Sequence, residues 1–136
     1  MIRNLQIEDY DKKYFSLLSQ LTSANILSKE KFQNIFNQIK DNVFVIEEDG
    51  KIVASGTLLI EQKFIHDGGL VAHMEDIVVD QDYRKKGYGY QIISFLINVA
   101  KEMGCYKIIA DCHETLLNFY SKNGFHSHGH QIALYF

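Results

Sequence analysis

One stretch of the chain constrains its fold more than any other, because an apolar strand runs through a basic, glycine-punctuated turn directly into a long amphipathic helix. This stretch covers residues 74–90 and reads MEDIVVDQDYRKKGYGY. Gly87 and Gly89 allow the backbone to approach a ligand closely and to adopt angles closed to other residues. Successive N–H groups can then converge on phosphate oxygens at the helix N-terminus, beside the positive charges of Arg84, Lys85 and Lys86. The stretch therefore predicts an anion site.

Two well-known phosphate loops do not fit these residues. A P-loop requires Gly-x-x-x-x-Gly-Lys-Ser/Thr, and a dinucleotide fingerprint requires a third glycine and a later acidic residue. Ile92 stands where that third glycine would be. The pattern that fits is Arg84-x-x-Gly87-x-Gly89, which resembles the pyrophosphate loop of the GNAT superfamily of N-acetyltransferases, whose loop amides hold coenzyme A. The alternative is a glycine-rich turn without a ligand.

Length and composition favour one enzyme domain. The chain has 136 residues, of which 46% are hydrophobic, so residues 1–136 are expected to form a single domain. A net charge of -3 provides no broad basic face, which argues against nucleic acid as a partner. We find no signal-peptide pattern and no apolar run of membrane-spanning length, and therefore expect a cytoplasmic protein without a membrane partner. Cys105 and Cys112 lie at opposite ends of a predicted strand, too far apart to bridge, so we expect reduced thiols.

Apolar spacing predicts an ordered series of elements. Strands are expected at Ile2 to Ile7, Val43 to Glu47, Ile52 to Ile60, Val71 to Val79, Tyr106 to Cys112 and Gln131 to Phe136, and helices at Tyr10 to Leu21, Lys29 to Ile39, from the glycine loop to Gly104, and Thr115 to Lys122. Ser28 is the expected N-cap of the second helix, and Asp49-Gly50 predicts a hairpin turn. The long helix is expected to bury Ile92, Ile93, Leu96, Val99, Ala100 and Met103.

The predicted order is an α/β (α+β) order, and it is also the order of the GNAT fold, a central mixed, mostly antiparallel sheet flanked by helices. Three segments, at residues 73–79, 104–112 and 118–125, are similar to the glucosamine 6-phosphate N-acetyltransferase family. The resemblance covers nearly the whole chain. It implies direct transfer of acetyl from acetyl-CoA to the amine of D-glucosamine 6-phosphate in a ternary complex, giving the N-acetylated sugar phosphate used to make UDP-N-acetylglucosamine.

Acetyl transfer requires a neutral amine and a group that protonates or stabilises the departing thiolate. By resemblance, Tyr120 has the second role, and Glu75 or Asp111 takes the amine proton directly or through water. A sugar amine could also enter already neutral. Tyr120 could instead be a core aromatic beside its phenylalanine neighbours, and each carboxylate could be a strand-end cap or half of an ion pair. Glu75 and Asp76 are expected on opposite faces of the sheet, so that only one faces the reaction centre.

The resemblance also implies the binding residues. The backbone of Ile77, Val78 and Val79 would pair with the pantetheine arm, and the loop Arg84, Lys85, Lys86, Gly87, Tyr88, Gly89 and Tyr90 would hold the pyrophosphate, with Tyr120 near the sulfur. The sugar phosphate would contact Thr22, Lys63, Phe64, Ile65, His66, Glu75, Asp76, Ile77, Tyr106, Lys107 and Asp111. A lysine such as Lys107 at a strand end can also be a solvated edge residue.

Two residues depart from the family pattern. Tyr90 stands where relatives commonly have a lysine, and Leu116 stands where many members have an asparagine. The proposed chemistry needs no metal. His126, His128 and His130 alternate and would share one face of a strand, where they could bind zinc, but an exposed polar loop is the favoured interpretation.

The last predicted strand, Gln131 to Phe136, stays apolar to its final residue, which is an awkward edge for an isolated subunit. The resembled family forms homodimers whose C-terminal segments intertwine and whose partner residue can reach the sugar site, so we expect a homodimer. The alternative is an edge strand docked within its own subunit. Two alternatives to the expected activity are transfer to another small amine or a protein N-terminus, and a noncatalytic coenzyme A sensor.

Overall fold

The dipeptide Asp49-Gly50 forms a hairpin turn between two strands of the central sheet. The computed structural model describes residues 1–136. Asp49 has φ +51° and Gly50 has φ +72°, the pair of positive values that a type I′ hairpin turn requires. This turn joins β2 (Val43–Glu48) to β3 (Lys51–Gln62) and pairs Glu48 with Lys51. The hairpin expected from the sequence is confirmed.

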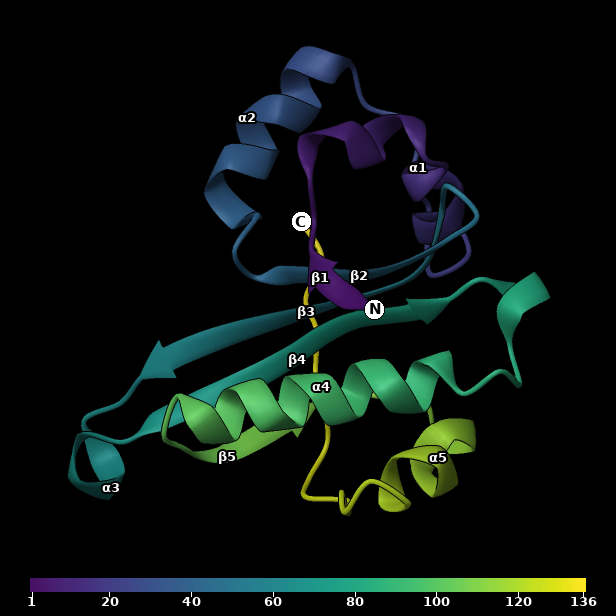
Figure 1. The fold of residues 1–136 in the computed structure, drawn as a ribbon. Helices are drawn as coiled ribbons and strands as arrows, with labels where there is room; N and C mark the ends of the chain where they lie inside the picture. Colours follow the sequence, from purple (N-terminus) through teal and green to yellow (C-terminus); the bar gives the residue numbers. More distant parts are fainter.

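The sheet has five strands in the order β1-β2-β3-β4-β5, where β1 is Ile2–Asn4, β4 is Leu70–Val79 and β5 is Cys105–Ala110 (Figure 1). All neighbours are antiparallel except β4 and β5, which are parallel. The parallel pairing stops where Met74 meets Ala110, whereas the pairing of β4 with β3 continues to Val79. The last part of β4 therefore has one edge with no strand beside it.

Helices cover both faces of the sheet. α4 (Tyr88–Glu102) lies on one face, and α1 (Tyr14–Leu18) and α2 (Lys29–Ile39) lie on the other (Figure 1). The remaining short helices are η1 (Ile7–Asp11), α3 (Ile65–Gly68), η2 (Gln81–Tyr83), η3 (Glu114–Leu116) and α5 (Leu117–Ser121). Ser28 caps α2 by accepting a hydrogen bond from the Lys31 amide, as expected. None of the helices has both the length and the apolar character needed to span a membrane.

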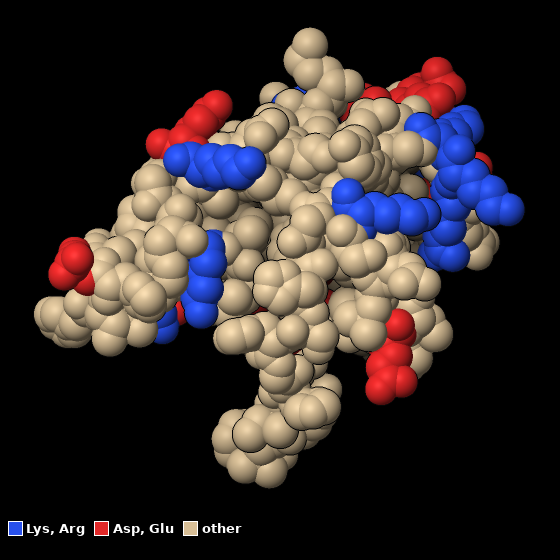
Figure 2. Space-filling view, turned by 90° about the horizontal axis from the view of Figure 1, so that it is seen from below, with Lys and Arg blue, Asp and Glu red and all other residues tan.

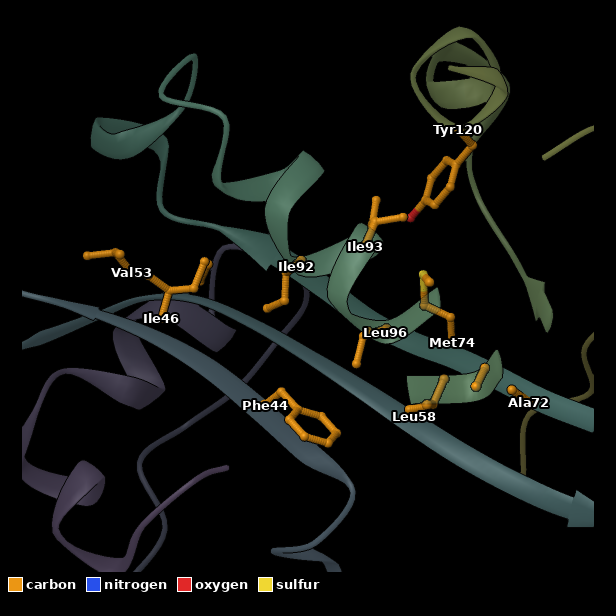
Figure 3. Close-up of a cluster of buried hydrophobic side chains, with 12 residues drawn as sticks. Phe44, Ile46, Val53, Leu58, Ala72, Met74, Ile92, Ile93, Leu96 and Tyr120 are labelled. Carbon is orange, nitrogen blue, oxygen red and sulfur yellow. The ribbon is translucent and has the colours of Figure 1, made fainter. Parts of the chain in front are cut away.

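Two apolar clusters hold these layers together. The first lies between the sheet and α4, where Ile92, Ile93 and Leu96 are fully buried (Figure 3). The second lies under α1 and α2. Burying each such side chain stabilises the fold by roughly 1.5 to 3 kcal/mol, so the two clusters fix the sheet between its helices. Met103 is half-exposed, so the expectation that it completes the buried stripe of α4 is wrong.

The elements near the N-terminus are shorter than expected. The strand predicted at Ile2 to Ile7 ends at Asn4, because Ile7–Asp11 forms a 3₁₀ helix. The helix predicted at Tyr10 to Leu21 is confined to Tyr14–Leu18, since Lys13 has φ +60° and interrupts helical geometry before it.

The strand predicted at Tyr106 to Cys112 is Cys105–Ala110, and both cysteines are free thiols.

The C-terminal segment does not form the predicted strand. Residues 131–136 have no regular structure, and the exposed fractions of Ile132 and Tyr135 are each 92%. Figure 1 shows the segment running on past α5 without joining the sheet. A strand forms only where another strand accepts its backbone hydrogen bonds, and this segment has no such partner within the chain.

A buried carboxylate fixes the start of the chain to the sheet. Asp9 is fully buried and accepts hydrogen bonds of 2.8 Å from both terminal nitrogens of Arg3 and from the Gln6 amide. Arg3 also contacts Glu47 of β2 at 2.5 Å. Burial alone would raise the pKa of Asp9, but the hydrogen bonds from Arg3 and Gln6 outweigh burial and lower the pKa below its ordinary value.

Replacing Asp9 with Asn is expected to lower the free energy of unfolding by about 1.5 to 3 kcal/mol at neutral pH, because Arg3 and the Gln6 amide lose their hydrogen bonds to a buried carboxylate while Arg3 keeps Glu47. The stabilisation by Asp9 is present above its ordinary pKa of 3.8 and is lost as the pH falls through the lower pKa of the folded state. The difference between wild type and variant should therefore shrink below pH 3.8. Urea unfolding at several pH values measures it.

Asp11→Asn is the matched control, because Asp11 pairs with Lys29 at 3.2 Å on the exposed surface. It should cost less than about 1 kcal/mol. Equal losses for the two variants would contradict the role assigned to Asp9.

Candidate functional site

Two carboxylates lie where β4 and β5 part. Glu75 is the first residue of β4 beyond the last parallel pair, and Asp111 directly follows β5. Burial raises the pKa of Glu75 above its ordinary value, and the charges of Asp111 and Asp76 raise it further. The fork between the strands thus brings together the two residues considered as proton acceptors, and the pKa of Glu75 is raised there.

A bulge in β4 changes the expected alternation of side chains. Asp76 has φ +52°, and between the pairs Thr57 with Glu75 and Ser55 with Val78 the strand gains one residue. The expectation that Glu75 and Asp76 point to opposite faces rests on regular alternation, and regular alternation is absent here. Asp76 lies close enough to Glu75 for its charge to raise the pKa of Glu75.

The strand beyond the bulge has its side chains fixed and its outer backbone edge free. Ile77 packs so closely over Gly56 that a Cβ at that glycine would lie 2.7 Å from its Cδ1 atom. Val79 packs on the same α4-side cluster as Ile77. Between Ile77 and Val79 the edge that faces away from β3 carries no strand, so its backbone groups, apart from the Val79 carbonyl that Arg84 contacts, are available to an extended ligand.

The basic loop leads from this edge to the N-terminus of α4. Lys85 has φ +65° and Gly87 has φ +84°, so the chain turns sharply before the helix. The first amides of α4 have no helical acceptor, and no side chain caps them. Arg84 donates to the Val79 carbonyl at 3.4 Å and, like Lys85, pairs with no carboxylate. Figure 2 shows basic side chains gathered at one edge of the molecule. Free amides beside unpaired cations form an anion site.

Tyr120 lies in α5 and packs into the apolar cluster beside α4. Its ring packs edge-on against Phe119 and Phe125, with centroid distances of 5.4 and 5.6 Å. Figure 3 shows its hydroxyl directed toward α4. Burial raises the pKa of Tyr120 above its ordinary value, and the nearby Cys112 adds a smaller effect in the same direction. The hydroxyl therefore stays protonated at neutral pH. The residue is therefore both a core aromatic and a potential proton donor.

A second polar cluster lies where β3 ends and β5 begins, since Gln62, Leu70 and Cys105 share one register row. His66 stacks on Tyr106 with a centroid distance of 4.2 Å, and Lys107 lies 5.8 Å from the same ring. Glu61 holds Lys63 at 3.0 Å. The segment with Lys63 and His66 and the distant segment with Tyr106 and Lys107 thus lie at the same end of the sheet.

Some residues expected in the site are not joined to these clusters. Thr22 is exposed in the turn after α1, where its amide donates to the Leu18 carbonyl. Phe64 is fully exposed and Ile65 is largely exposed. Leu116 is partly exposed at the start of α5. His126, His128 and His130 are exposed, and no group of three His, Cys, Asp or Glu side chains could hold a metal ion.

The candidate site does not coincide with either of two surface pockets. The two pockets that stand out on the surface, of about 180 and 120 Å³, lie around η1 and α2 and contain none of the expected site residues.

The sequence patterns did not identify several residues that contact the site. His73 contacts Glu61 at 2.8 Å beside the carboxylate fork. Asp80, Lys51 and Glu48 contact the basic loop or the segment before it. The only local signal was Asp80, because an Asp that follows a strand and precedes a turn is a typical cap. Lys51 and Glu48 come from a distant hairpin, which no local pattern connects to the loop.

Comparison with known proteins gives consistent matches. Residues 2–125 match the family described as Acetyltransferase (GNAT) family. Glucosamine 6-phosphate N-acetyltransferase 1 of Dictyostelium discoideum is 44% identical, and the alignment covers 98% of this chain and 88% of that protein. Probable glucosamine 6-phosphate N-acetyltransferase 2 of Oryza sativa subsp. japonica is 40% identical over 99% of this chain and 87% of its own length.

A solved structure matches the fold over its whole length. The crystal structure of glucosamine-6-phosphate N-acetyltransferase from Arabidopsis thaliana superposes with a TM-score of 0.96. It is 40% identical, and the match covers 100% of this chain and 97% of that one.

Proposed function

The chain belongs to the GNAT family of acetyltransferases, within it to the glucosamine 6-phosphate N-acetyltransferases, and we propose that it acetylates the amine of D-glucosamine 6-phosphate. The GNAT family uses acetyl-CoA as the acyl donor. The products are N-acetyl-D-glucosamine 6-phosphate and CoA, a step in the synthesis of UDP-N-acetylglucosamine. The observation that carries this proposal is the fork of β4 and β5, which places Glu75 and Asp111 beside a free strand edge leading to an anion site.

Acetyl-CoA fits the edge and the loop together. The pantetheine arm would pair with the backbone of Ile77, Val78 and Val79 as an added strand. The pyrophosphate would then meet the first amides of α4 and the cations of Arg84 and Lys85, within the segment Arg84, Lys85, Lys86, Gly87, Tyr88, Gly89 and Tyr90. Tyr90 offers no cation there, and its ring is largely exposed.

The sugar phosphate fits between the two polar clusters. Its phosphate would meet Lys107, Lys63 and His66 near the Tyr106 ring, and its amine would meet the fork. Lys63 already forms an ion pair with Glu61, whereas Lys107 pairs with no carboxylate and is more available to the phosphate. Asp76 and Ile77 would border the sugar, and Thr22, Phe64 and Ile65 are proposed contacts that approach it from the rim.

The chemistry then requires two proton transfers. The amine nitrogen attacks the thioester carbonyl, so an N–C bond forms and the C–S bond breaks. Glu75, whose pKa is raised by burial and by Asp111, accepts the amine proton directly or through water, or Asp111 does so. Tyr120 donates its proton to the departing thiolate and regains one from solvent.

We propose that the functional protein is a cytoplasmic homodimer built from one acetyltransferase domain per chain, without nucleic acid, membrane or metal. The support for the dimer is the C-terminal segment, in which Ile132, Leu134, Tyr135 and Phe136 are all largely exposed. Gln131 begins this segment and donates to Asp111 at 3.0 Å. A partner that covers the segment would therefore border the reaction centre.

The first experiment mixes purified protein with acetyl-CoA and follows free thiol release. We expect release with glucosamine 6-phosphate and much less with glucosamine or a peptide amine, because those two acceptors have no phosphate to bind Lys107, Lys63 and His66. Release with another amine instead would favour a different acceptor for the same fold. Coenzyme binding without release on any amine would replace the proposal with a sensor.

Replacing Tyr120 with Phe, or Glu75 with Gln, is expected to lower kcat by about 100-fold, because each removes one proton transfer. The KM for acetyl-CoA should change little, since neither side chain belongs to the loop. Steady-state kinetics measures both constants. Because Phe keeps the ring packing against Phe119 and Phe125, the thermal stability of the Phe variant should match that of wild type.

Glu102→Gln, at the exposed end of α4, is the control for the charge change. An unchanged kcat in Glu75→Gln would assign the amine proton to Asp111 or to solvent. An unchanged kcat in Tyr120→Phe would leave Tyr120 with only its packing role.

Leu134→Glu is expected to shift the protein from dimer to monomer and to reduce its activity, because a charge on the apolar C-terminal segment opposes its burial against a partner. Sedimentation measures the mass. Ile26→Glu is the matched control, because Ile26 is 73% exposed and Leu134 is 79% exposed, but Ile26 lies in the segment before α2. A wild-type monomer, or equal effects of the two variants, would reject the dimer.

A further inference from the structure

The turn between β2 and β3 contacts the segment that carries the coenzyme loop. Lys51 lies directly after the Asp49-Gly50 turn, and its Nζ contacts an Asp80 carboxylate oxygen at 2.9 Å. The same Nζ lies 5.0 Å from the centroid of the Tyr83 ring. Figure 1 shows this turn at the side of the molecule where β4 leads through η2 into α4.

Asp80 organises the start of that segment. It is 3% exposed, its amide donates to the Val53 carbonyl at 2.8 Å, and its carboxylate accepts from the Asp82 amide at 3.0 Å. Burial alone would raise the pKa of Asp80, but the hydrogen bonds from Lys51 and the Asp82 amide outweigh it and hold the pKa below its ordinary value. A buried carboxylate of this kind depends on its cation, because an unpaired charge in this position is costly.

The contacts continue into the loop itself. The Tyr83 ring lies close to two ammonium groups, with Lys51 at 5.0 Å and Lys86 at 4.7 Å from its centroid. Glu48, at the other end of the β2–β3 turn, accepts a hydrogen bond from the Tyr88 hydroxyl and lies 3.8 Å from Lys86. The turn therefore holds residues before, within and after the sharp bend at Gly87.

We infer that Lys51 is a positioning residue for coenzyme binding, which fixes Asp80 and Tyr83 and through them the shape of residues 84–90 without touching the coenzyme. This inference rests on the proposed function of that loop. The amides at the start of α4 bind an anion only when they point together, and a loop already held in that shape loses less conformational freedom on binding. Lys51 supplies this restraint from a strand that is anchored in the sheet.

Lys51→Gln tests the inference with coenzyme A as the titrant in calorimetry. We expect the Kd for coenzyme A and the KM for acetyl-CoA to rise about tenfold, the size of effect expected from one lost charged hydrogen bond. The KM for glucosamine 6-phosphate and the kcat at saturating acetyl-CoA should stay within about twofold. Lys51→Arg should restore most of the affinity, because a guanidinium can still reach the Asp80 carboxylate and the Tyr83 ring.

Lys29→Gln is the matched control. Lys29 also pairs with an aspartate, Asp11, and lies 5.4 Å from a tyrosine ring, that of Tyr10, but it lies on α2. It should leave both constants unchanged. The double variant Lys51→Gln/Asp80→Asn removes the buried unpaired charge, so it tests the same loss of affinity if Lys51→Gln proves unstable.

Each outcome decides the inference. Coenzyme affinity in Lys51→Gln and in the double variant equal to that of Lys29→Gln would overturn it, as would an equal rise in both KM values, which would mean general loosening of the fold. Failure of the wild-type protein to bind coenzyme A would overturn the proposed function and this inference together. Normal wild-type binding with a selective loss in Lys51→Gln would support it.

Discussion

The functional architecture depends on the early end of one strand pairing. β5 stops at Ala110 beside Met74, while β4 continues to Val79 with only β3 at its side. A strand with one free edge in the interior of a sheet is a binding surface, because its backbone groups still need partners. The same separation places Glu75 and Asp111 at the fork, where burial, and then the charge of Asp111, raise the pKa of Glu75. One break in pairing thus produces both the free edge and the pair of carboxylates on which the proposed function depends.

The free edge is useful only if the helix that follows it points its first amides at the same ligand. Gly87 and Lys85 allow the sharp turn, since both adopt positive φ. Local flexibility of this kind does not select one loop shape, and the selection comes from the rest of the sheet. The ion pair of Lys51 with Asp80 and the contacts of Glu48 supply it from the β2–β3 turn. A loop with two positive φ values is thereby held by residues far from it in the sequence.

The sequence predicted the parts of the fold that depend on local patterns. Asp49-Gly50 predicted its hairpin and Lys29 to Ile39 predicted α2, because turn chemistry and apolar period act over a few residues. It did not predict the bulge at Asp76, which depends on how β3 and β4 pair, nor the pairing of Lys51 with Asp80. The roles of Glu75, Asp111 and Tyr120 came from resemblance, and the structure places the two carboxylates at one fork and Tyr120 in the apolar cluster beside α4.

The one large failure of the sequence prediction has a physical cause that bears on function. Gln131 to Phe136 has the composition of a strand, but a strand also needs a neighbour, and within one chain its apolar side chains remain exposed. A free apolar segment of this kind opposes solubility unless it is covered. Because Gln131 donates to Asp111, the segment starts at one of the two fork carboxylates. Anything that covers the start of the segment would therefore lie next to the fork carboxylate Asp111.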